Sequence, residues 1–231
     1  MLDRRCKSIE EAMAGIEDGA TVMISGFGEA GRPNYLIKCL MDTGVKDLTL
    51  VSNNAGAGYE GLAMLLRREM VKKLVCSFPR GAMGDEVQRL IKEHGLVIEV
   101  NPQGTLAERI RAAGCGIPAF FTPTAYGTAL AEGKETREID GKGCVLETAL
   151  QADFALVKAH KADRWGNLTY LNLARNFSPL MAMAANTTIV EADEIVELGQ
   201  LEPNTIVTPG ICVDRLVLTR PVADHEWGAA A

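Results

Sequence analysis

In residues 21–33, a short apolar run leads into a glycine-rich turn and a proline: Thr21-Val22-Met23-Ile24-Ser25-Gly26-Phe27-Gly28-Glu29-Ala30-Gly31-Arg32-Pro33. The apolar run is typical of a strand that is buried on both faces. Pro33 suits the first turn of a helix, because its missing N–H has no partner to lose there. The stretch therefore predicts a strand, a turn and a helix in succession.

The same order recurs downstream and fixes the predicted fold class. Further strands are expected at residues 48–52, 73–77 and 97–100, and helices at 62–70, 86–94 and 106–113. This repetition predicts an α/β protein with an open, mainly parallel sheet and helices on both faces. Ligands of such sheets gather beyond the carboxyl ends of the strands. Three turns follow these ends, at residues 25–32, 53–56 and 101–105.

After Gly114 the chain changes character. Shorter strands are expected there, with Asp140-Gly141 and Trp165-Gly166-Asn167 as turn signals. Core strands are expected at residues 152–157, 187–191 and 213–218. We expect residues 1–220 to form a single domain and residues 221–231 to form a frayed C-terminal tail.

The glycine turn matches the G-x-G-x-x-G pattern of dinucleotide-binding proteins. That pattern requires an acidic residue at the end of the next strand, to hold a ribose hydroxyl. Here the next strand ends in Ser52-Asn53-Asn54, without a carboxylate. NAD binding is therefore disfavoured. Two interpretations remain open at this point: a backbone that approaches some other ligand closely, or a tight turn with no ligand.

Composition narrows the function classes. The 231 residues carry a formal net charge of -6, which disfavours nucleic-acid binding. The six cysteines form no CxxC pair and the three histidines are scattered, so neither a disulfide framework nor a metal site is expected. No apolar run approaches the ~18 residues of a membrane span, and no apolar leader follows Met1. We expect a cytoplasmic protein.

Residues 18–33 resemble the first signature of the class I CoA-transferases: Asp-Gly, three apolar residues, Gly-Gly-Phe and Gly-x-Pro, with Ser25 at the place of the first glycine. Other blocks similar to this family follow in order, at residues 51–56, 102–111, 121–128, 165–168 and 174–177. Within the family, the chain looks most like the A (alpha) subunits of the 3-oxoadipate enzymes, at residues 76–80, 133–141 and 158–170.

The resemblance implies a CoA-transferase/NagB-like α/β/α sandwich and a covalent mechanism. A glutamate of the family attacks an acyl-CoA and becomes an enzyme-bound CoA thioester. That glutamate lies in a Ser-Glu-Asn-Gly-like motif of a B (beta) subunit, and this chain has no such motif. The resemblance therefore implies a heterodimer or heterotetramer that uses coenzyme A, as succinyl-CoA, as a substrate. No permanently bound cofactor and no metal are expected.

The resemblance also assigns roles to residues. Gln103 would donate a hydrogen bond to the oxyanion of each tetrahedral intermediate; the alternative is a polar residue in a Pro-Gln-Gly turn. Asn53 and Asn54 would bind the acyl substrate, with capping of the strand end as the alternative. Arg32, Arg80 and Lys134 are candidates for a substrate carboxylate, although a solvated surface charge is favoured. The expected wall beside the CoA thiol arm consists of Ser25, Gly26, Phe27, Gly28, Glu29, Ala30 and Gly31.

The predicted function is transfer of CoA from succinyl-CoA to 3-oxoadipate in the β-ketoadipate pathway of aromatic catabolism. One alternative keeps this chemistry but changes the acid to acetoacetate or a short-chain fatty acid. A more distant alternative is a metabolite-sensing α/β domain that performs no chemistry.

Overall fold

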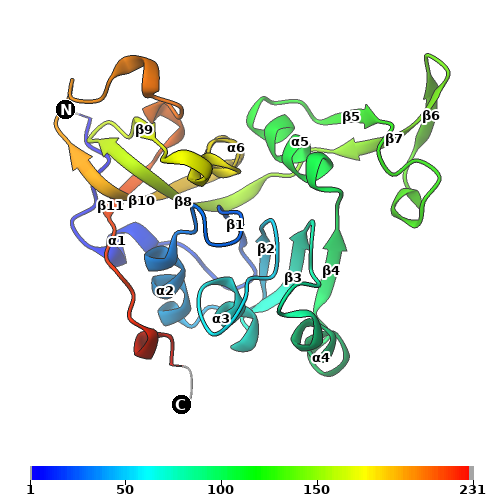
Figure 1. The fold of residues 1–231 in the computed structure, drawn as a ribbon, viewed down its shortest axis with the longest axis horizontal. Coiled ribbons are helices and arrows are strands. Elements are labelled where there is room, and N and C mark those ends of the chain that lie inside the picture. The colour runs from blue at the N-terminus through cyan, green and yellow to red at the C-terminus, as the bar shows by residue number, and fades with distance from the viewer. Residues whose placement is uncertain (1, 229–231) are drawn as a thin grey trace.

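A parallel sheet forms the centre of the molecule (Figure 1), which we describe from a computed structural model over residues 2–228. Its strand order is β11-β10-β8-β1-β2-β3-β4, and these seven strands are parallel throughout. The short strand β9 adds an antiparallel pair to β8. The strands are β1 Thr21–Ile24, β2 Leu48–Val51, β3 Val71–Cys76, β4 Val97–Val100, β8 Ala152–Asp163, β9 Leu168–Thr169, β10 Ala185–Val196 and β11 Arg215–Leu218.

Both faces of the sheet are buried, because successive side chains of a strand point to opposite faces. Val22 and Ile24 belong to one core cluster, whereas Met23 between them belongs to the other. The first cluster packs under α1–α4 and the second under α5 and α6. The predicted α/β architecture is therefore confirmed. The helices are α1 Ile9–Met13, α2 Asn34–Thr43, α3 Leu62–Arg67, α4 Gly84–His94, α5 Gln103–Gly114 and α6 Ser178–Ala184.

Some helix boundaries differ from the sequence-based prediction. Ser8 caps α1, since its hydroxyl accepts a hydrogen bond from the Glu11 N–H at 3.3 Å. The Glu11 carboxylate accepts from the Lys7 N–H, so the capping box is not closed on Ser8. Helix α5 begins at Gln103, three residues earlier than expected. Gln103 is therefore the first residue of a helix and does not lie in a turn before it.

A second, three-stranded antiparallel sheet projects from the body, and we call it the arm (Figure 1). Its strand order is β5-β7-β6, with β5 Ala119–Thr122, β6 Thr136–Ile139 and β7 Lys142–Thr148. Asp140 and Gly141 join β6 to β7 with φ angles of 49° and 71°. Two positive φ values in a two-residue hairpin loop characterise a type I′ turn. All four residues of β6 are exposed.

Residues 221–228 pack against the body. Trp227 is 2 % exposed and belongs to the core cluster under α1–α4. Arg220 forms an ion pair with Glu226 at 2.8 Å. The end of the expected frayed tail, residues 229–231, lies outside the described residues. Over residues 2–228, the helices lack the combination of length and apolar character that a bilayer crossing requires.

Candidate functional site

Four strand ends meet along one edge of the main sheet. β1, β2, β3 and β4 are neighbours and run in the same direction, so their carboxyl ends share this edge. The backbone N–H groups of Ser77 and Phe78 donate to the Asn53 carbonyl at 3.1 and 3.2 Å. The Asn101 N–H donates to the Cys76 carbonyl at 2.9 Å. The three turns predicted to gather at this edge do so.

Gln103 and Asn53, 50 residues apart in the chain, are in direct contact at this edge. Gln103 Nε2 donates to Asn53 Oδ1 at 2.7 Å, and the Ser77 hydroxyl donates to the same oxygen at 2.9 Å. Asn53 is 5 % exposed, whereas Gln103 is exposed. A primary amide carries two N–H donors. The second N–H of Gln103 is therefore available to a ligand while the buried Asn53 holds the side chain in place.

The glycine turn is held from behind by Ser25. The Ser25 hydroxyl donates to the Gly31 carbonyl at 3.0 Å and accepts from the Lys158 N–H at 3.2 Å. Ser25, Gly26 and Gly31 are buried, while Phe27 is 52 % exposed. A serine at the first glycine position therefore connects the two ends of the turn and fastens them to β8.

The outer part of the turn is a two-residue hairpin. Phe27 and Ala30 exchange backbone hydrogen bonds at 3.0 and 3.2 Å. Gly28 has a φ of 59°, and Glu29 has no positive φ, which fits a type II′ turn. A Cβ at Gly28 would meet nothing within 4 Å, whereas one at Gly31 would lie 2.5 Å from the Ala174 carbonyl oxygen. Gly31 is therefore required by packing, and Gly28 by the backbone conformation alone.

Asn176 connects the glycine turn to the surroundings of Gln103. Its side chain accepts from the Gly26 N–H at 3.2 Å and donates to the Ala30 carbonyl at 2.8 Å. Asn176 also lines a hollow of about 210 Å³ together with Gln103, Gly104, Ala107, Phe177 and Leu180. Sequence reasoning did not single out Asn176 or Ser77 as site residues. Their only signal was membership of the family-like blocks at residues 174–177 and 76–80.

The other candidate residues occupy different settings. Asn54 Oδ1 accepts from the Gly56 N–H at 2.8 Å, a bond within its own loop. Arg32 was expected to be a solvated surface charge, and this is wrong. Its side chain is 2 % exposed and pairs with Glu29 and Glu60 at 2.6 and 2.7 Å. The two carboxylates offset the positive charge of the guanidinium. The same two ion pairs join the glycine turn, at Glu29, to the loop that contains Glu60.

The two remaining cationic candidates differ from each other. Arg80 is exposed, whereas Lys134 pairs with the buried Glu147 at 2.7 Å and lies in the arm. Neither shares the hollow that contains Gln103.

The chemistry available at the edge is hydrogen-bond donation. Burial raises the pKa of the Cys76 thiol to about 11, so this thiol is protonated at neutral pH and is not a nucleophile. Over residues 2–228, no cluster of three or more His, Cys, Asp or Glu side chains has an arrangement suited to a metal ion. What the edge presents is an amide donor, exposed backbone and a small hollow.

Comparison with known proteins identifies a matching family. The sequence pattern of the Coenzyme A transferase family matches residues 6–219. The A subunit of the 3-oxoadipate CoA-transferase of Pseudomonas putida is 58 % identical over 94 % of this chain and 94 % of its own length. The A subunit of the succinyl-CoA:3-ketoacid coenzyme A transferase of Xanthomonas campestris is 52 % identical over 93 % of this chain and 88 % of its own length.

A solved structure shares the fold. The acyl-CoA transferase apoenzyme of Escherichia coli O157:H7 superposes with a TM-score of 0.82 at 20 % sequence identity. The superposition covers 97 % of this chain but 50 % of that one, so this chain spans half the length of that protein. At this identity, the likeness concerns the fold alone.

Proposed function

Because the chain belongs to the coenzyme A transferase family, we propose that it is the A subunit of an enzyme that moves CoA from succinyl-CoA to 3-oxoadipate. The relative named for 3-oxoadipate, at 58 % identity over 94 % of both chains, supports this choice of acid. The observation that carries the proposed mechanism is the exposed Gln103 amide, fixed on the buried Asn53 beside the glycine turn.

The reaction begins with attack of a carboxylate on the succinyl-CoA thioester. The new C–O bond produces a tetrahedral intermediate, and the thioester carbonyl oxygen becomes an oxyanion. Gln103 donates its free N–H to this oxyanion. A donor that is already in position stabilises the developing charge without reorganising, and removing one such donor typically costs roughly 10²–10³ in rate.

Collapse of the intermediate breaks the C–S bond and leaves a mixed anhydride and the CoA thiolate. The thiolate then attacks the glutamyl carbonyl of the anhydride, which releases succinate and forms the enzyme-bound thioester. The same steps in reverse, with 3-oxoadipate as the attacking acid, release 3-oxoadipyl-CoA. Every step passes through an oxyanion, so one donor serves all of them.

The nucleophilic glutamate of this proposal belongs to a B subunit. The sequence contains Glu-Gly at 60–61 and 132–133 but no Ser-Glu-Asn-Gly motif. Both relatives described above are named as A subunits. The exposed face of the Ser25–Gly31 turn forms the wall beside the CoA thiol arm, and the partner completes the site in a cytoplasmic heterodimer or heterotetramer of the β-ketoadipate pathway.

A second acid remains a candidate because the 52 % identical relative is named for 3-ketoacids. Reconstitution of this chain with its B subunit, followed by parallel assays of 3-oxoadipate and acetoacetate with succinyl-CoA, tests the choice. The proposal predicts a higher kcat/KM for 3-oxoadipate. A higher kcat/KM for acetoacetate would replace the first acid with the second and keep the mechanism.

A further inference from the structure

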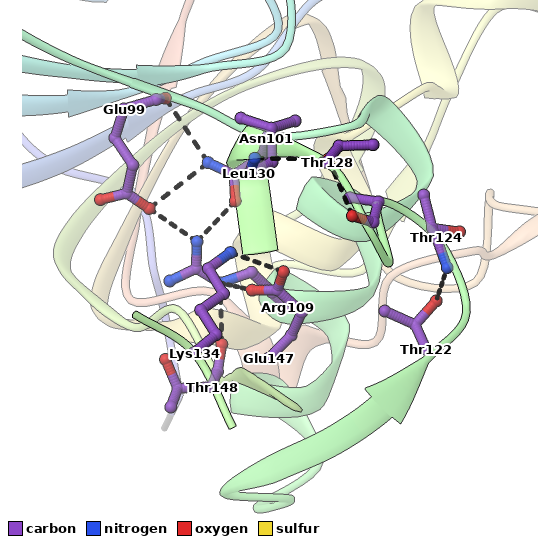
Figure 2. A network of polar contacts seen from close by, with 11 residues as sticks. Glu99, Asn101, Arg109, Thr122, Thr124, Thr128, Leu130, Lys134, Glu147 and Thr148 are labelled. Carbon is purple, nitrogen blue, oxygen red and sulfur yellow. Dashed lines mark hydrogen bonds and ion pairs between the residues drawn. The ribbon is translucent and has the colours of Figure 1, made fainter. Parts of the chain in front are cut away.

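A series of alternating charges runs from the main sheet into the arm. Lys73 of β3 pairs with Glu99 of β4 at 2.7 Å, and Glu99 pairs with Arg109 of α5 at 2.7 Å. Arg109 Nε lies 4.0 Å from Glu147 of β7, and Glu147 pairs with Lys134, before β6, at 2.7 Å. Figure 2 shows the part of this series from Glu99 to Lys134. Five elements or loops that are distant in sequence are thereby joined through side chains.

Arg109 lies at the centre of the series and contacts two strands, β4 and β7, and the segment that follows β4. Its Nη1 donates to Glu99 Oε1 at 2.7 Å and to Asn101 Oδ1 at 2.6 Å, and its Nε donates to the Thr148 carbonyl at 2.8 Å (Figure 2). The side chain is 10 % exposed. A planar guanidinium can satisfy several fixed acceptors at once, which the compact ammonium of lysine cannot do with the same geometry.

The hydrogen bond between Arg109 and Asn101 is important because Gln103 lies between these two residues in the sequence. Asn101 follows β4 and is 2 % exposed, and Gln103 begins α5 two residues later. Arg109 lies in the same helix, so its bond to Asn101 ties the body of α5 to the chain just before the helix starts. Gln103 therefore lies in a short segment whose ends, Asn101 and Arg109, are hydrogen-bonded to each other.

We propose that Arg109 is a positioning residue that fixes the Gln103 amide in place and couples it to the root of the arm. The proposal rests on the donor role of Gln103 given above. The Arg109 guanidinium bonds both Thr148, at the arm root, and Asn101, so a displacement of the arm root would also displace Asn101. A displaced Gln103 would still bind substrate but would meet the oxyanion poorly, so the cost falls on kcat rather than on KM.

A double-mutant cycle in the complex with the B subunit tests this role. Arg109→Lys keeps the positive charge but loses the planar guanidinium that bonds several acceptors at once. We expect it to lower kcat by up to about 100-fold with little change in KM. In the Gln103→Ala background the same substitution should have almost no further effect. Equal losses in both backgrounds would show that Arg109 acts independently of Gln103 and would overturn the proposal.

The matched control is Arg111→Lys, two residues along the same helix. Arg111 is 40 % exposed and pairs with Glu108 of its own helix, so kcat should not change. If Arg109→Lys fails to assemble, Asn101→Ala removes the contact next to Gln103, together with the long donations of Asn101 Nδ2 to Glu99 at 3.4 and 3.5 Å. It should reproduce the kcat loss and the lack of additivity. Full activity of a folded Asn101→Ala complex would also contradict the proposal.

Hydrogen exchange of the isolated chain separates this inference from the proposed function. Arg109→Lys should speed amide exchange in residues 106–109, the first hydrogen-bonded N–H groups of α5, and in β7 together, whereas Arg111→Lys should leave both unchanged. Faster exchange in only one of the two segments would refute the coupling. A Gln103→Ala enzyme with normal turnover would instead remove the proposed donor role, and the exchange result would then decide the coupling alone.

Discussion

The carboxyl edge of the main sheet and the arm hold their loops by different means. At the edge, backbone hydrogen bonds join neighbouring strand ends, and the buried Asn53 accepts from Ser77, which follows β3, and from Gln103, which begins α5. The arm has a fully exposed strand β6, and charged side chains join its root to the body. The comparison shows that the edge is joined mainly through backbone hydrogen bonds between strand ends, whereas the arm root combines charged side chains with backbone contacts such as Leu150 N–H to the Arg109 carbonyl at 2.9 Å.

The largest effect should come from Gly31 at the edge. Gly31→Ala places a Cβ 2.5 Å from a backbone oxygen at a φ of 73°. Overpacking and left-handed strain together should lower the free energy of unfolding by about 3 kcal/mol, as measured by urea denaturation. Gly28→Ala is the matched control, since its Cβ meets open space, and should cost about 1–2 kcal/mol. Equal losses would mean that the turn is not packed as described.

Gly28→Val then probes the ligand without a packing conflict. Its added methyl groups would extend from the exposed side of the turn, where the CoA arm is proposed to pass. We expect a raised KM for succinyl-CoA in the assembled enzyme. Normal CoA kinetics in the assembled Gly28→Val enzyme would exclude the turn from the binding site.

The next effect is on catalysis. Gln103→Ala should lower turnover at least about 100-fold, equivalent to about 2.7 kcal/mol, with assembly unchanged. Gln151→Ala is a matched control, because Gln151 also donates its amide to an asparagine, Asn186, at 3.0 Å. Gln151 precedes β8 and therefore lies at the opposite edge of the sheet. Unchanged turnover in Gln103→Ala would remove Gln103 from the mechanism.

A smaller effect should appear in the pH dependence of stability. Burial would raise the pKa of Glu99, but hydrogen bonds from Lys73 and Arg109 outweigh burial and hold this pKa at about 2. A lowered pKa stabilises the fold above the ordinary value of 4.5, and this stability is lost as pH falls towards 2. After solvent screening we expect about 1–2 kcal/mol from this group.

Glu99→Gln measures that contribution directly. The variant should be less stable than the parent at pH 7, and the difference should shrink between about pH 4.5 and pH 2 in urea titrations. Glu108→Gln, which affects only an exposed pair on α5, should show a smaller change. A stability difference that does not depend on pH would disprove the electrostatic role of Glu99.

The smallest effect is expected in the arm. Arg137 of β6 stacks over the Phe121 ring with its guanidinium carbon 4.7 Å from the centroid, and it forms an exposed ion pair with Glu135. Arg137→Ala should cost less than about 1 kcal/mol in thermal or urea unfolding. A loss comparable to that of Gly31→Ala would show that the arm is part of the cooperative core.

Sequence patterns predicted the sheet edge much better than the arm root. Strands at residues 21–24 and 97–100 follow from local apolar runs, and the parallel order brought Asn53 and Gln103 to one edge. The helical start at Gln103 was missed because the turn signal of Pro-Gln-Gly resembles that of a loop. Local pattern could not reveal the setting of Arg32, because its partner Glu60 lies 28 residues away.

The setting of Arg109 was not predicted from the sequence for the same reason. Its acceptors come from β4, from the chain after β4 and from β7, and no spacing rule connects such distant positions. The residues three and four positions away from Arg109 in its helix are Thr105, Leu106, Ala112 and Ala113, so no charged neighbour on the helix points to its partners either. Only the folded arrangement shows that Arg109 is buried at a junction.

The most direct test concerns the origin of the nucleophile. The reconstituted complex is incubated with succinyl-CoA, the glutamyl thioester is trapped, and the mass of each chain is measured. The predicted result is a mass increase confined to the B subunit, which is lost when its Ser-Glu-Asn-Gly-like glutamate is replaced. A thioester on any carboxylate of this 231-residue chain would contradict the account.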